Sequence, residues 1–120
     1  MSSTLRSMAM RGGSPDEIRA IAGELLALLE REHRVVDGEI AQYPKPIPRC
    51  DAQFNFLYDQ RSALSEPIAW LREALRGHDN EEIVRACTRV ASRVPCTQAE
   101  HESAVRARLR DALASADAAR

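Results

Sequence analysis

Two apolar stripes on either side of a short proline-rich linker constrain the fold of this chain more than any other feature. Residues 43–49 contain three prolines and link two segments whose apolar residues repeat at three- and four-residue spacing, as on one face of a helix. Short connections make helices antiparallel neighbours, so we predict a helix hairpin. The stripes are Ile18, Ala22, Leu25, Leu29, Val36 and Ile40 before the linker, and Phe54, Leu57, Leu64, Ile68, Leu71 and Leu75 after it.

Folding the chain about the linker also predicts a register. The stripes match when the numbers of facing residues sum to about 93, so that Ile18 faces Leu75. Glu32 and His33 interrupt the first stripe where Arg61 interrupts the second. We therefore expect a Glu32–Arg61 ion pair inside the hairpin, with His33 at its edge, because polar core positions can fix a register. The alternative is that this polar layer forms a ligand or metal site.

Four helix-start signals predict four helices. Residues 14–17 place a capping serine before a proline and a glutamate, and residues 97–100 form a capping box. Asp51 and either Asp79 or Asn80 can cap the second and third helices. We expect the helices to end before Pro44, at Gly77 and near Val94, with the fourth reaching the C-terminus.

The fold class that follows is all-α, a four-helix bundle built on a long antiparallel hairpin. Residues 14–120 form its single domain, and residues 1–13, which are small and polar, are expected to be a disordered tail. Pro67 lies inside the second helix and removes a backbone hydrogen bond. We therefore expect a kink there, or a break after which Ser65 caps a second piece.

Both hairpin helices carry a second apolar strip that a hairpin alone cannot bury. We expect the third and fourth helices to cover part of these strips and a second copy of the chain to cover the rest, which predicts a homodimer. This prediction fails if the monomer already buries the largest members of the strips. The strips are Ile21, Leu28 and Val35 in the first helix, and Phe56, Ala63, Trp70 and Ala74 in the second.

The charge and composition of the chain narrow the classes of binding partner that we expect. The chain has 17 Lys+Arg against 18 Asp+Glu, whereas nucleic-acid binders usually carry a basic excess. The arginines of the third and fourth helices, including Arg89 and Arg106, alternate with glutamates, so we expect a solvated, salt-bridged face and no nucleic acid. We see no signal peptide and no apolar run of membrane-spanning length, and expect a cytoplasmic protein with reduced thiols and no membrane partner.

Few residues in the sequence suggest a metal-binding or catalytic site. The spacing of Glu30 and His33 is that of one half of a di-iron carboxylate site, but the matching second half is missing. Cys50, Cys87, Cys96 and His101 are zinc-ligand types without zinc spacing, and Cys96 with His101 gives only a faint nucleophile–base pair. We therefore predict no catalytic residue, no metal and no cofactor, and do not expect an enzyme.

Three functions remain open. The leading prediction is a small protein-interaction or adaptor module that acts as a homodimer through helix faces. The alternative is a bundle that binds a metal or small ligand through Glu32, His33, Arg61 and His101. The third is a nucleic-acid-associated regulator that uses the arginines of the last two helices.

Overall fold

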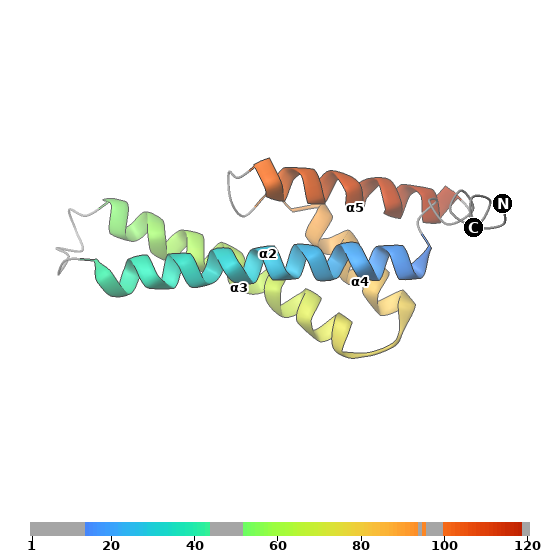
Figure 1. Ribbon diagram of the computed structural model, residues 1–120, viewed down its shortest axis with the longest axis horizontal. Coiled ribbons are helices and arrows are strands. Elements are labelled where there is room, and N and C mark those ends of the chain that lie inside the picture. Colours follow the sequence, from blue (N-terminus) through green and yellow to red (C-terminus); the bar gives the residue numbers. More distant parts are fainter. Residues whose placement is uncertain (1–13, 44–51, 94, 96–99, 119–120) are drawn as a thin grey trace, which may run out of the picture.

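The described residues form a bundle of four helices (Figure 1). The computed structural model describes residues 14–43, 52–93, 95 and 100–118, which contain no strand. The all-α prediction and its long antiparallel hairpin are confirmed. The helices are α2 (Pro15–Gln42), α3 (Ala52–Arg76), α4 (Asn80–Ala91) and α5 (Glu100–Ala118).

The caps that the structure describes agree with the sequence. The Ser14 hydroxyl accepts a hydrogen bond from the Glu17 backbone N–H at 3.1 Å. The Asp79 carboxylate accepts one from the Glu81 backbone N–H at 3.0 Å, so Asp79 rather than Asn80 caps α4. Each bond satisfies an amide that the first helical turn leaves without an internal partner. The predicted caps at Asp51 and Thr97 lie outside the described residues.

Pro67 is accommodated within an unbroken α3. The Ser65 hydroxyl donates to the Arg61 carbonyl, one turn back in the same helix, at 2.9 Å. The prediction that Ser65 begins a second helical piece is therefore wrong. The proline side chain is buried, so its packing offsets part of the cost of the missing hydrogen bond.

The second helical pair packs on one side of the hairpin. Helix α5 runs antiparallel to α2 and packs directly on its first half, and α4 packs against α3, α5 and α2 (Figure 1). This pair buries Ile21 and Leu28 of the second apolar strip, together with Ala74. The central core residues are Ile18, Leu25, Leu29, Leu64, Leu71, Ile83, Val90, Val105 and Leu109.

A buried arginine of α5 forms an ion pair within its own helix and hydrogen bonds to the end of α4. The Arg106 side chain is 1% exposed, and its Nε donates to the Glu102 carboxylate at 2.7 Å. Its guanidinium also donates to the backbone carbonyls of Val90, at 2.7 Å, and of Arg93, at 3.4 Å. Arg106 thus caps the C-terminal end of α4, where carbonyls lack intrahelical partners. The expectation that Arg106 lies on a solvated face is wrong, because its charge is neutralised internally.

None of the described helices combines the length and the apolar content that crossing a membrane would require.

Arg106→Ala is expected to lower the free energy of unfolding by about 3–5 kcal/mol, because it leaves the Glu102 carboxylate buried without its guanidinium partner. Urea denaturation followed by circular dichroism measures this loss. Arg108→Ala is the matched control, since its ion pair with Glu24 is exposed and is expected to contribute less than about 1 kcal/mol. Equal losses in the two variants would contradict the structural role assigned to Arg106.

Candidate functional site

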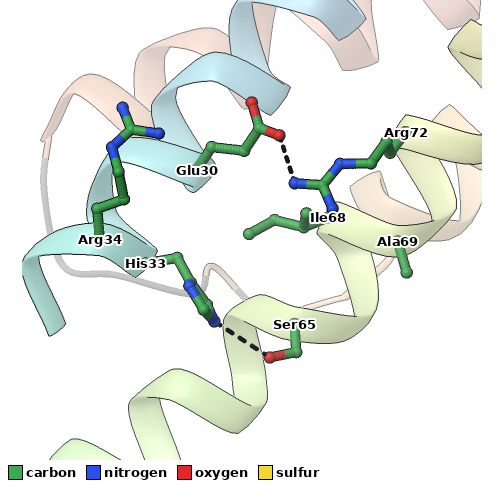
Figure 2. A pocket seen from close by; sticks show the side chains of 7 residues that line it. All are labelled: Glu30, His33, Arg34, Ser65, Ile68, Ala69 and Arg72. Carbon is green, nitrogen blue, oxygen red and sulfur yellow. Dashed lines mark hydrogen bonds and ion pairs between the residues drawn. The ribbon is translucent and has the colours of Figure 1, made fainter. Parts of the chain in front are cut away.

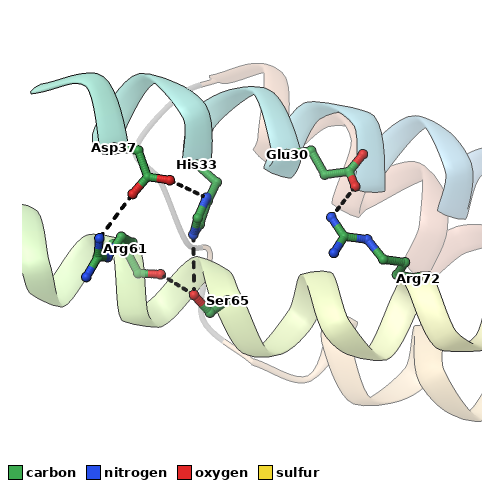
Figure 3. A network of polar contacts seen from close by, with 6 residues as sticks. All are labelled: Glu30, His33, Asp37, Arg61, Ser65 and Arg72. Atoms are coloured by element: carbon green, nitrogen blue, oxygen red, sulfur yellow. Dashed lines mark hydrogen bonds and ion pairs between the residues drawn. The ribbon is translucent and has the colours of Figure 1, made fainter. Parts of the chain in front are cut away.

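A polar network lines the side of the hairpin that α4 and α5 leave open (Figure 3). The Asp37 carboxylate contacts His33 Nδ1 at 3.2 Å through one oxygen and an Arg61 guanidinium nitrogen at 3.2 Å through the other. The exposed fractions of the three side chains are 29% for His33, 44% for Asp37 and 38% for Arg61. The network is therefore a half-exposed edge of the hairpin rather than a buried layer.

The predicted Glu32–Arg61 ion pair is wrong in its acidic partner. Arg61 contacts Asp37, which lies further along α2 than Glu32. The two pairs that cross the hairpin here, Asp37 with Arg61 and His33 with Ser65, each have residue numbers that sum to 98, so facing residues at this edge are offset from the predicted register of about 93. His33, the third member of the predicted layer, does lie in the same network as Arg61.

Ser65 of α3 lies against His33 of α2. Its hydroxyl donates its one proton to the Arg61 carbonyl at 2.9 Å and lies 3.4 Å from His33 Nε2. The imidazole ring of His33 therefore lies between the two helices, with Nδ1 facing the Asp37 carboxylate and Nε2 facing Ser65.

A cavity of about 260 Å³ opens beside this network, between α2 and α3 (Figure 2). Its basic groups are Arg34, His33 and Arg72, and Arg72 is ion-paired with Glu30. Small side chains on α3 leave the space that these groups surround. The lining residues are Glu30, His33, Arg34, Ser65, Ile68, Ala69 and Arg72.

The structure brings together only part of the predicted ligand set. His33 and Arg61 share the polar network. His101 is exposed near the start of α5, and Glu32 is half-buried on α2. Neither lines the cavity beside His33. Ligand binding by all four residues stays a prediction, and the geometry favours His33 as its centre.

Sequence reasoning missed four residues of this site. Asp37, Ser65, Arg34 and Arg72 carry no motif, and none interrupts an apolar stripe. A signal was nevertheless present in the helical spacing. Glu30 and His33 precede Asp37 at intervals of seven and four residues, which places all three on one face of α2.

The described residues offer little support for a metal site or a nucleophile. They contain no cluster of three or more His, Cys, Asp or Glu side chains that could hold a metal ion. Glu30, predicted as half of a di-iron motif with His33, is paired with Arg72. Burial raises the pKa of the Cys87 thiol to about 12, so Cys87 stays protonated and unreactive at neutral pH. Cys50 and Cys96 lie outside the described residues.

The arginines of α4, and Arg93 just after it, are engaged with other side chains. Arg89 and Arg93 lie over the Trp70 ring, 4.2 and 5.2 Å from its centre, and Arg93 is also paired with Glu66. Arg85 is 3.9 Å from a Glu81 oxygen. These contacts support the prediction of a salt-bridged face and leave few free guanidinium groups for phosphates there.

Exposed apolar side chains gather at the linker end of the hairpin. The teal and green ends of α2 and α3 extend beyond α5 along the long axis of the molecule (Figure 1). Phe56 is 59% exposed and Val35 is 50% exposed. Ile21 and Leu28, by contrast, are buried within the monomer, and Trp70 is half-buried. The surplus apolar surface is thus smaller than the sequence predicted, and it includes Val35 and Phe56 at this end.

Comparisons of this chain with protein-family models, with curated proteins and with solved structures find no match.

Asp37→Asn is expected to lower the free energy of unfolding by about 0.5–1 kcal/mol, because it weakens contacts to both His33 and Arg61, which are partly exposed. Urea denaturation measures the change. Asp59→Asn removes an exposed carboxylate of the same hairpin and serves as the control, with an expected change below about 0.5 kcal/mol. A loss above about 2 kcal/mol for Asp37→Asn would mean that the network is more shielded from solvent than its exposure indicates.

Proposed function

We propose that this protein is a helical interaction module that self-associates through the linker end of its α2–α3 hairpin. The observation that carries the proposal is the exposure of Phe56, 59%, and of Val35, 50%. Large apolar side chains exposed together on one face are typical of protein–protein contact sites.

The two side chains belong to the face of the hairpin that α4 and α5 cover elsewhere. Val35 follows the buried Leu28 by two helical turns on α2, and Phe56 precedes the buried Pro67 by three turns on α3. Both pairs are therefore in phase on their helices. Val35 and Phe56 continue a face that is buried in the first half of the hairpin and exposed in the second.

The ion pairs that tie α4 and α5 to the hairpin indicate where these two helices stop covering it. Arg108 of α5 contacts Glu24 of α2 at 2.9 Å, and Arg93, just beyond α4, contacts Glu66 of α3. Antiparallel helices rise equally per residue, so the first residue of α5, Glu100, lies about level with Glu32 of α2. No described residue of α4 or α5 extends over the hairpin beyond that level.

A second copy of the chain fits this surface better than an unrelated partner. Each copy presents an uncovered pair of helix ends of the same length, and each needs an apolar partner of that length. A two-fold axis through the middle of this section brings Phe56, which lies near its centre on α3, close to its equivalent in the other copy. Burying each of these aromatic side chains contributes on the order of 1.5–3 kcal/mol.

Phe56→Gln is expected to weaken self-association at least about tenfold, because a central aromatic side chain typically dominates such an interface. Sedimentation equilibrium over a range of protein concentrations measures the dissociation constant. Thermal unfolding at low concentration, where the monomer prevails, is expected to change little, because Phe56 is mostly exposed in the monomer.

Tyr58→Gln is the matched control for this test. Tyr58 is a neighbouring aromatic residue of α3, but it packs against Phe54, at 4.8 Å between ring centres, and under Arg61 on the open polar side of the hairpin. We expect Tyr58→Gln to leave the dissociation constant within about twofold of wild type. A wild-type protein that stays monomeric at the highest concentration, or a Phe56→Gln variant that associates as wild type does, would refute the proposal.

A further inference from the structure

We propose that the cavity between α2 and α3 binds a phosphate group, either as free phosphate or as a small phosphate monoester, through Arg34, His33 and Arg72 (Figure 2). This site lies on the polar side of the hairpin, away from the surface proposed for self-association. It therefore stands on different residues and can be tested separately.

The balance of charge around the cavity favours an anion. The guanidinium of Arg72 is neutralised by Glu30, the only carboxylate among the described lining residues. Arg34 is exposed, and no ion pair with an acidic residue is seen for it within the described chain. His33 adds a polar ring nitrogen, Nε2, on the cavity side, while its Nδ1 is paired with Asp37. The cavity thus carries a net positive charge.

The hydrogen-bond donors can be redirected toward a ligand at little cost. The contact between His33 Nε2 and Ser65 is 3.4 Å long, so it is weak and readily exchanged for a stronger one. Asp37 holds the other ring nitrogen and keeps the imidazole in place between the two helices (Figure 3). Guanidinium groups bind phosphate oxygens through charge-assisted hydrogen bonds, which are stronger than neutral ones, and an imidazole N–H can donate to such an oxygen as well.

The volume and the lining residues of the cavity limit the class of ligand that it can bind. A volume of about 260 Å³ is just below the range of typical small-molecule pockets, so a compact anion fits and a nucleotide does not. Ile68 and Ala69 provide an apolar wall beside the basic groups. A phosphate monoester with a small apolar group would place that group against this wall.

The test is a titration with inorganic phosphate at constant ionic strength, followed by the NMR signals of the His33 ring and the Ser65 amide. The expected result is saturable binding that shifts these two signals. The Phe56→Gln background keeps the protein monomeric if the proposed function is correct, so failure of one proposal does not affect the test of the other.

Glu30→Gln is the most discriminating variant. It removes the carboxylate that competes for Arg72, so phosphate affinity is expected to rise about three- to tenfold. Glu24→Gln is the control, because Glu24 lies on the same helix and its loss frees Arg108 in the same way, but away from the cavity. We expect this control to leave the affinity unchanged. Damage to the fold cannot produce a gain in affinity.

Arg34→Gln is expected to lower phosphate affinity about three- to tenfold, with Arg31→Gln, an exposed arginine of α2 outside the cavity lining, as its control. Phenyl phosphate separates the two ligand sources: tighter binding than phosphate supports a monoester, and equal binding supports the free ion. The proposal is overturned if the His33 and Ser65 signals do not respond, or if each variant behaves as its control does.

Discussion

The arrangement of this bundle depends on the guanidinium of Arg106. It binds the Val90 carbonyl at the end of α4 and is neutralised by Glu102 on its own helix, both contacts being buried. A charged group in this position is strongly destabilising unless all its partners are present, so these contacts hold α5 against the C-terminal end of α4. Arg19 of α2 makes a similar contact at the end of the hairpin away from the linker. Its guanidinium donates to the Gly77 carbonyl, just after α3.

Fixing α5 against α4 determines which part of the hairpin is covered. Helix α5 reaches along α2 only to about the level of Glu32, and the ion pair of Arg93 with Glu66 marks the limit on α3. Beyond these points one face of the hairpin exposes Phe56 and Val35. The opposite face carries the polar network and its cavity. Both candidate surfaces therefore follow from the way α4 and α5 pack on one face of the hairpin.

The sequence predicted the helices well because their signals are local. Apolar spacing and caps such as Ser14 depend on residues within one or two turns, and these gave the bounds of α2 and the N-terminus of α4. Contacts between long polar side chains were not predictable in the same way. The Arg61 side chain is long enough to reach any carboxylate on the facing part of α2, and in the structure it contacts Asp37. Glu102 and Arg106 have the spacing of an ordinary surface pair, and only tertiary packing makes them core residues.

Few buried side chains support the linker end of the hairpin within the part of the chain that the structure describes. The buried apolar side chains at this end are Val36 and Leu57, and a network as exposed as that of Asp37 contributes at most about 1 kcal/mol. A tilted contact between the rings of Tyr43 and Phe54, at 5.3 Å between ring centres, adds a comparable amount. Any partner that binds only the folded hairpin stabilises it by mass action. Association at this end and the stability of the hairpin are therefore thermodynamically linked, even though the contacts involve different faces of the same two helices.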